Sequence, residues 1–361
     1  MRYIYNAKSL PAIRREQLQK LDDAAKRLAK KIADTNVAQL PLSDYGKENV
    51  ADFQRKAEET IKKYVHILAW LLFPESAKSS EMFVDYGGGH GLLGGLAKEA
   101  GFPNVIYNDI FSGCADDARK LAKHLGCEAD AYVVGDIHAV AAALKANPPA
   151  SGAIASINVI EHIYDMDDFL KAAGSLARGP MTMVLSTSAN PLNPSVARRH
   201  YRQHNEWEFT DGPHESSYPM DTLRAFRDVR RDIIKEAASG LAASDVETLT
   251  SVTRGMHKAD IQKAVKNFQA TKQMPPAPKH PTNTCDPLTG SWQERLLDIG
   301  DVRATLGSCG FGVRVMGGYY AAHDGGAAKK AVAKLLNHGI SLLGSQGARL
   351  APCIMFHAAR R

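Results

Sequence analysis

The residues of this sequence that are best suited to chemistry follow a short apolar run. Residues 82–84 lead into Asp85, and after it come Tyr86, three glycines, His90 and Gly91. Glycine has no Cβ atom, so the backbone can approach a ligand closely at such positions. The pattern predicts a strand, a tight turn and the start of a helix, which together bind a nucleotide-like cofactor. Asp85 adds a carboxylate at the end of the strand.

The glycine turn alone fits two classes of cofactor. Residues 89–94 read GHGLLG, which satisfies the GxGxxG pattern of dinucleotide-binding turns. Residues 85–91 read DYGGGHG, which places an acid two residues before a GxGxG pattern. Glycine-rich turns are common, so the ends of the later strands have to distinguish the two classes.

Three further apolar runs end in polar residues. The second run ends in Asp109, 18 residues beyond Gly91, where a carboxylate can accept the ribose hydroxyls of either cofactor. The third run ends in Asp136, which is followed by Ile137. The fourth run leads into residues 158–163, which read NVIEHI. An acid after the third strand is not a standing requirement of a dinucleotide dehydrogenase.

These motifs, in this order, resemble those of class I S-adenosylmethionine (SAM)-dependent methyltransferases that act on small molecules. In that family the first acid faces the methionine ammonium of SAM, and the third-strand acid contacts the adenine amino group. The motif at the fourth strand is similar to V-[IL]-E-H-[IVL]. The resemblance covers residues 80–190 well and 290–358 more loosely. It implies these cofactor-binding residues: Asp85, Tyr86, Gly87, Gly89, Gly91, Asn108, Asp109, Ile110, Gly135, Asp136, Ile137 and Asn158.

The charge of SAM agrees with this resemblance. SAM is positively charged near its sulfonium and has no phosphate, so a site with Asp85, Asp109 and Asp136 suits it. The same carboxylates would repel a pyrophosphate. The alternatives outside the class are an NAD-dependent oxidoreductase and a catalytically inactive SAM-binding module.

The acceptor atom decides which catalytic group is needed. A hydroxyl acceptor has to lose its proton as the new bond forms, so a base within hydrogen-bond reach is useful. His162 is the candidate base and Glu161 would orient it, with His214 or Asp286 as alternatives. The sequence predicts methyl transfer to a small-molecule or glycan-type acceptor, with oxygen favoured. An RNA or protein methyltransferase is the alternative within the class.

The order of apolar and helical patterns predicts the fold. Helices over 12–34 and 47–73 form a helical cap, and five strands that alternate with helices follow from residue 81. This alternation predicts an α/β fold with a doubly wound, Rossmann-like sheet of the seven-stranded methyltransferase type. The predicted domains are a helical cap (1–75), a SAM-binding core (76–190), a helical insertion that forms a substrate lid (191–290) and the completion of the core (291–361).

The insertion supplies the substrate-side candidates. Its basic, aromatic stretch 198–207 is interpreted as a solvated face or lid. Helices are expected at about 220–239 and 245–271. The proline-flanked loop 281–290 carries many small polar groups, which are often used for recognition. The candidates for substrate contact are His214, Asn283, Cys285 and Asp286.

A late helix over 329–343 follows a strand at 311–320 and precedes a last strand at 351–358. Its apolar residues Val332, Leu335, Leu336 and Leu343 fall towards one side, and lysines cluster near its start. Packing against the core is the default expectation. The alternative is contact with a membrane surface.

Composition narrows the classes of protein further. The formal charge of +6 is modest for 361 residues and the basic residues are spread along the chain, so no nucleic-acid partner is expected. The five cysteines are scattered, which argues against a disulfide framework or a zinc site, and no metal is predicted. The start has no apolar signal segment, and no run is long enough to cross a bilayer. We expect a cytoplasmic protein, with a homo-oligomer left open.

Overall fold

The structure is a computed structural model of the whole chain. It describes residues 2–4, 15–72, 81–214, 222–321 and 326–360. The beginning of the predicted helix 12–34 and the end of the predicted helix 47–73 lie outside these residues.

Seven strands form one sheet in the order β3-β2-β1-β4-β5-β7-β6. The strands are β1 (Phe83–Tyr86), β2 (Val105–Asp109), β3 (Ala131–Val134), β4 (Gly152–Ile157), β5 (Met181–Thr187), β6 (Gly312–Gly317) and β7 (Ile354–Arg360). β7 runs antiparallel to β5 and β6, and the pairings among β1–β5 are parallel. The predicted doubly wound α/β sheet is confirmed. Because the strand order reverses between β1 and β4, a ligand site is expected at the carboxyl ends of these two strands.

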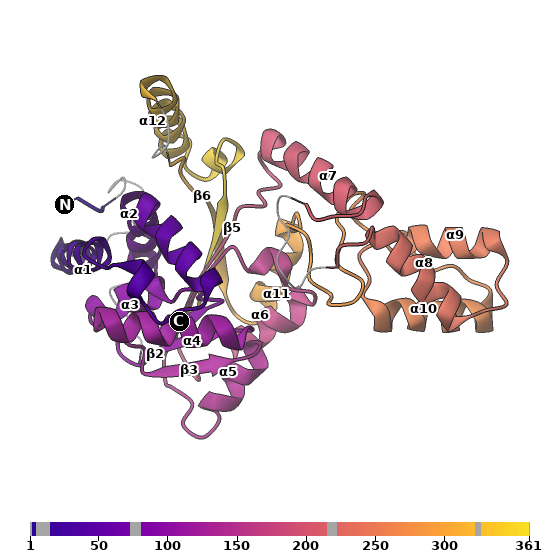
Figure 1. Cartoon of the computed structure of the whole chain (residues 1–361), viewed down its shortest axis with the longest axis horizontal. Helices are drawn as coiled ribbons and strands as arrows, with labels where there is room; N and C mark the ends of the chain where they lie inside the picture. Colours follow the sequence, from indigo (N-terminus) through magenta and orange to yellow (C-terminus); the bar gives the residue numbers. More distant parts are fainter. Residues whose placement is uncertain (1, 5–14, 73–80, 215–221, 322–325, 361) are drawn as a thin grey trace. The chain divides into compact units, whose positions relative to one another are not determined.

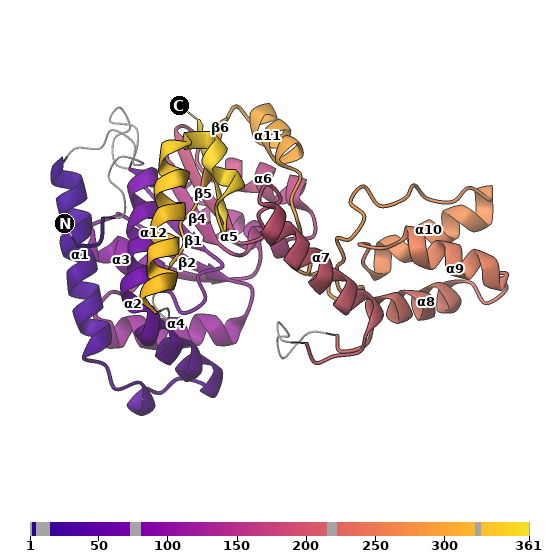
Figure 2. The same ribbon diagram turned by 90° about the horizontal axis from the view of Figure 1, so that it is seen from above.

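Helices cover both faces of this sheet (Figures 1 and 2). They are α1 (Arg15–Ala33), α2 (Asp44–Leu71), α3 (Leu92–Glu99), α4 (Ser112–Leu125), α5 (Ile137–Leu144), α6 (Met166–Gly174), α11 (Ile299–Ser308) and α12 (Ala327–Leu342), with short 3-10 helices η2 (Val37–Gln39), η3 (Ile160–His162) and η4 (Gly344–Arg349). Side chains alternate between the faces of a strand. Phe83 therefore joins the core that contains α1–α4, whereas the Tyr86 ring lies 5.0 Å from the ring of Phe169 on α6.

Helix α2 packs against the sheet, so it places side chains that are distant in the sequence beside the strands. Ser43 caps its first turn by accepting a hydrogen bond from the Gly46 N–H. Its last residues, 64–71, are apolar almost all round, and Ile61, Ile67 and Leu68 are fully buried. This burial fixes the helix against the sheet and fixes the polar side chains that precede its apolar end.

The chain divides into two compact units. The first contains the sheet and consists of Met1–Ile160, Asp167–Thr187 and Ile299–Arg361. The second consists of Glu161–Met166 and Ser188–Asp298. The second unit thus includes the predicted insertion 191–290, but it also takes in the short segment that follows β4.

The second unit is built around helices. They are α7 (Pro194–Phe209), α8 (Phe226–Ala237), α9 (Ala243–Val252) and α10 (Lys258–Thr271). Apolar residues of α8, α9 and α10 form a shared core. Arg230 and Glu208 form a fully buried bidentate ion pair, and the Thr284 hydroxyl donates to the same carboxylate at 2.8 Å. A buried charge is tolerated only when it is paired and hydrogen-bonded in this way.

Two details of the sequence prediction are wrong. The helix expected over 245–271 is two helices, because the chain turns through Gly255 at φ +79°. The stretch 198–207 lies within α7 and has a buried side with His200, His204 and Trp207, so it is not a fully solvated face.

Candidate active site

The turn after β1 uses glycine where the backbone requires it. Gly87, Gly89 and Gly91 have φ values of +65°, +52° and +74°. This left-handed region strongly favours glycine. A Cβ atom on Gly87 would lie 2.4 Å from Cγ2 of Val159, whereas a Cβ on Gly89 would meet nothing within 4 Å. Gly87 is therefore required by packing, and Gly89 borders open space.

Asp85 lies directly beneath this turn. Only 2% of Asp85 is exposed, and its Oδ2 accepts a hydrogen bond from the Gly94 N–H at 2.8 Å. Gly94 can approach because it has no Cβ; one placed there would be 3.1 Å from Oδ2. Burial, with a smaller contribution from the charge of Asp109, raises the pKa of Asp85 to about 7. The carboxylate is thus poorly stabilised by the protein alone.

Asp109, at the end of β2, reaches the other side of the turn. Its carboxylate accepts hydrogen bonds from the backbone N–H groups of Gly89 and Phe111, each at 3.0 Å. Burial raises its pKa, although these donors oppose the shift. In the part of the chain that the structure describes, no ion pair joins Asp85 or Asp109 to a basic side chain. Two buried carboxylates without a cation favour a cationic ligand.

A cavity of about 240 Å³ opens beside Asp85 and the glycine turn. Helix α2 supplies one wall through Tyr45, Asn49 and Tyr64. The sequence pattern pointed to none of these three residues, since nothing local in α2 shows that it crosses the turn. The cavity has Asp85 in its wall, and Asp109 accepts from the same glycine turn, which fits a cofactor with a positively charged end.

His90 is a site residue that the sequence showed only as part of the turn. Its Nδ1 is buried and has no hydrogen-bond partner in the described structure, and its ring meets Phe53 edge-on at 5.1 Å. Burial lowers the pKa of His90 to about 4, so the imidazole is neutral near pH 7. It lines the same cavity as Asp85.

The end of β3 is organised by side-chain hydrogen bonds. The Asn108 amide donates to the carbonyls of Val133 and Gly135, at 3.1 and 2.9 Å. Asp136 caps α5 by accepting from the His138 and Ala139 N–H groups. The Asn108 amide is thus used inside the protein, and Asp136 has a structural role whether or not it also contacts a ligand.

Apolar side chains are exposed at the same edge. Ile110, next to Asp109, is 62% exposed, and Val134 is 46% exposed. Exposed aliphatic side chains beside a polar pocket suit the faces of a planar ring. Ile137, by contrast, is buried. Asn158 follows β4 with φ +55°, and its N–H donates to the Ser186 carbonyl.

Glu161 and His162 belong to the second unit. Glu161 is fully buried, and its Oε1 accepts from the Ser188 N–H at 3.2 Å. The His162 Nδ1 lies 2.8 Å from the Trp292 carbonyl oxygen. Because a carbonyl only accepts, Nδ1 carries the proton and Nε2 keeps its lone pair. That tautomer is the one a base acting through Nε2 needs.

The four substrate-side candidates are engaged within the second unit. Asn283 exchanges two hydrogen bonds with the Leu296 backbone, and Asp286 accepts from backbone N–H groups including those of Thr222 and Leu288. Cys285 is fully buried and burial raises its pKa. The side chain of His214 lies against Trp207, with ring centroids 4.5 Å apart. All four hold the fold of this unit.

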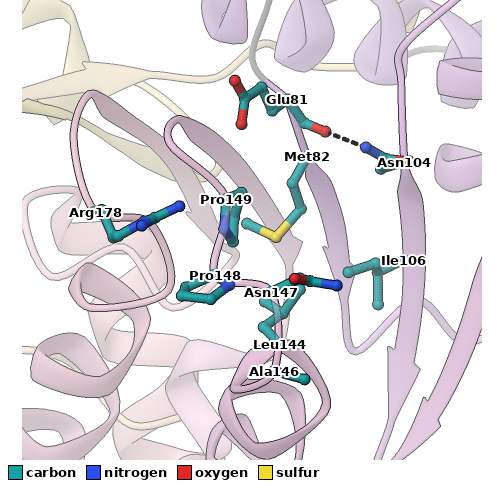
Figure 3. A pocket seen from close by; sticks show the side chains of 10 residues that line it. All are labelled: Glu81, Met82, Asn104, Ile106, Leu144, Ala146, Asn147, Pro148, Pro149 and Arg178. Atoms are coloured by element: carbon teal, nitrogen blue, oxygen red, sulfur yellow. Dashed lines mark hydrogen bonds between the residues drawn. The ribbon is translucent and has the colours of Figure 1, made fainter.

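Two other cavities lie in the first unit. The larger, about 530 Å³, is bordered by Met82, Pro148, Pro149 and Arg178 and by the Glu81 carbonyl, which accepts from the Asn104 amide at 2.7 Å (Figure 3). It lies at the amino-terminal ends of the strands, opposite the glycine turn, so it is not the site of chemistry.

The other cavity, about 230 Å³, lies at the carboxyl end of β6. Its walls include His66 on α2 and Tyr319, whose rings meet edge-on at 5.7 Å. The His66 Nδ1 is buried and, among the described residues, has no hydrogen-bond partner. The cavity lies at the same edge of the sheet as the glycine turn.

This arrangement is the one expected of an α/β enzyme that binds a nucleotide-type cofactor at the switch point of its sheet. Residues 53–226 match a family model described as a methyltransferase domain. This match supports the class that the sequence motifs predict, a class I SAM-dependent methyltransferase. No curated protein matches the chain.

Solved structures with a similar arrangement have little sequence in common with this chain. The YcgJ protein from Bacillus subtilis is 11% identical, with 79% of this chain and 94% of that chain covered and a TM-score of 0.39. A SAM-dependent methyltransferase from Archaeoglobus fulgidus is 15% identical, with 88% and 100% covered and a TM-score of 0.39. Magnesium protoporphyrin IX methyltransferase from Synechocystis, with bound SAH, is 13% identical, with 93% and 94% covered and a TM-score of 0.36.

Proposed function

We propose that this methyltransferase holds SAM in the cavity beside the glycine turn and transfers its methyl group to an oxygen atom of a small-molecule or glycan-type acceptor. The observation that carries the cofactor site is the pair of buried carboxylates, Asp85 and Asp109, without a basic partner in the described structure. Asp85 would face the ammonium of the methionine moiety. Asp109 would accept the ribose hydroxyls.

The backbone of the turn would do the rest of the positioning. The open space at Gly89 leaves room for the cofactor, and the neutral His90 offers a hydrogen bond without adding a second positive charge to the cavity. Ile110 and Val134 would cover the adenine, and Asp136 and Ile137 would border it. Bound SAM supplies an electrophilic methyl group on a sulfonium, so the chain's contribution is to orient the acceptor in line and exclude water.

Binding measurements test the cofactor site. By calorimetry, SAM should bind at micromolar concentrations and NAD should not. Replacement of Asp109 by Ala should weaken SAM binding on the order of 100-fold, because it removes charge-assisted hydrogen bonds. Asp130→Ala is the matched control, since Asp130 caps the opposite end of β2 by accepting from the Val105 N–H. Equal SAM affinity in Asp109→Ala and Asp130→Ala would contradict the site.

The proposed base is His162, which follows the end of β4 by five residues. Its Nδ1–H is held by the Trp292 carbonyl, so Nε2 can take the acceptor's proton. His162→Gln should lower the rate at which SAH, the demethylated product of SAM, is formed, by about 100-fold or more. The affinity for SAM should stay unchanged. Full turnover in this variant would remove His162 from the mechanism and would leave the cofactor site untouched.

The cavity beside His66 and Tyr319 is the candidate acceptor site, because its volume of about 230 Å³ suits a small acceptor group and it lies at the same edge of the sheet as the glycine turn. The test is incubation of the protein with methyl-labelled SAM and host extract, followed by ultrafiltration. A small-molecule acceptor places the label in a compound of the filtrate that is separated from SAM by chromatography. Label retained with protein or RNA would support the alternative acceptors instead.

A further inference from the structure

Helix α12 contradicts the expectation that it packs into the core. Only Ala333 and Ile340 of its residues are buried. Asn337, on the same side, exchanges hydrogen bonds with the Tyr320 backbone at 2.8 and 3.0 Å. A Cβ on Gly347 would lie 2.2 Å from the Ile340 carbonyl oxygen, so η4 also packs tightly on this side. The helix is thus anchored by one face.

The opposite face of α12 exposes an aliphatic stripe. Its largest side chains are Val332 (56% exposed), Leu335 (72%), Leu342 (73%) and Leu343 (50%). At about 100° per residue these four fall within one sector of about 100° of the helix. In Figure 1, α12 extends beyond the end of β6, away from the sheet. Exposed apolar side chains that lie together and are rimmed by polar residues mark a candidate interaction surface.

Basic residues flank the stripe. Lys329 and His338 project about 90° to either side of its centre, and Lys330 and Lys334 are exposed farther round the helix. From residue 325 to residue 361 the sequence has six Lys or Arg residues and no Asp or Glu. This excess is as large as the formal net charge of the whole chain, +6. Three of these six, Lys329, Lys330 and Lys334, lie on α12, so the helix that carries the stripe is itself basic.

We propose that α12 binds in the plane of an anionic membrane surface. The aliphatic stripe would enter the boundary between headgroups and acyl chains, and the flanking lysines would contact anionic lipid headgroups. A second copy of the chain fits less well, because it would bring its own lysines towards this helix and no carboxylate on α12 would meet them. The inference rests on the exposed face alone and does not depend on the cofactor or the acceptor.

Vesicle sedimentation with the full chain tests this proposal. We expect the protein to pellet with vesicles of equal parts phosphatidylcholine and phosphatidylglycerol, less so at high salt, and not with phosphatidylcholine alone. The double variant Leu335→Ser/Leu342→Ser should bind these vesicles at least tenfold more weakly than the wild type. Replacement of Lys329 and Lys334 by Gln should weaken binding on the order of 25-fold, at about fivefold for each lysine.

The controls remove equally exposed residues elsewhere. Leu288→Ser, at a side chain that is 55% exposed, and Lys263→Gln/Lys266→Gln on α10 should pellet like the wild type. Unchanged SAM affinity in all variants shows that they fold. Failure to pellet, or pelleting that the leucine variant retains, overturns the proposal. A concentration-dependent dimer that Leu335→Ser/Leu342→Ser abolishes would assign the stripe to a second copy and would also overturn it.

Discussion

The affinity for SAM should rise about tenfold or more between pH 5.5 and pH 7. Burial raises the pKa of Asp85 to about 7, so the carboxylate is mostly protonated at the lower pH. A cationic ligand binds its ionised form, and binding therefore releases a proton. The amino group of SAM stays protonated through this range, since α-amino groups have pKa values near 7.7. Calorimetry at a series of pH values measures the change directly.

Two other titratable groups of the cavity, His90 and Cys114, do not account for this dependence. The pKa of His90 is lowered to about 4 and that of Cys114 is raised to about 11, both by burial. The pKa of Asp109 is also raised by burial, which would steepen the rise in affinity. Asp85→Asn keeps an acceptor for the Gly94 N–H and should bind SAM weakly, with a much flatter pH profile. A wild-type affinity that is constant over this range would contradict the assignment of Asp85.

The same shift has a consequence for the protein without ligand. Between the ordinary pKa of an aspartate, about 4, and the folded value of about 7, the native state binds more protons at Asp85 than the unfolded state. Its contribution to the free energy of unfolding therefore falls as the pH rises through this window. SAM should offset that loss, so the thermal stabilisation by SAM should be larger at pH 7 than at pH 5.5.

The parts of the site that follow from local chemistry could be predicted from the sequence. A strand that ends in Asp85 and a run of glycines determine a tight turn, whatever the rest of the chain does. Asp109 could be placed because parallel strands in a doubly wound sheet bring their carboxyl ends to one edge. The order of apolar runs, acids and glycines along the sequence was sufficient to predict both the turn and the position of Asp109.

The parts that depend on contacts between distant segments could not be predicted. Tyr64 lines the cavity only because α2 packs on the sheet, and the periodicity of α2 does not say which strand lies beneath it. The polar loop at Asn283 and Asp286 looked like a recognition loop, but its side chains hydrogen-bond to backbone within the second unit. The leucines of α12 recur at helical spacing whether they pack on the core or face solvent. Only the structure shows that they are exposed.

Alanine at Gly87 and at Gly89 should affect different properties of the protein. At Gly87 the new Cβ would lie 2.4 Å from Cγ2 of Val159, with φ at +65°. Overpacking and left-handed strain together should lower the free energy of unfolding by about 2–5 kcal/mol. At Gly89 a Cβ meets no atom within 4 Å, so strain alone should cost about 1–2 kcal/mol.

For SAM binding the order should be reversed, with Gly89→Ala the more harmful of the two substitutions. A Cβ on Gly89 would project into the space that we assign to SAM, so Gly89→Ala should weaken SAM binding on the order of 100-fold, about 2.7 kcal/mol. Thermal denaturation and calorimetry on the same samples separate the two effects. The double variant Gly87→Ala/Val159→Ala should recover the overpacking part of the lost stability, because the clashing methyl groups are gone. The double variant Gly89→Ala/Val159→Ala should show no such recovery of stability. If Gly89→Ala binds SAM like the wild type, the cofactor does not lie against the turn, and the carboxylates beneath it need another cation.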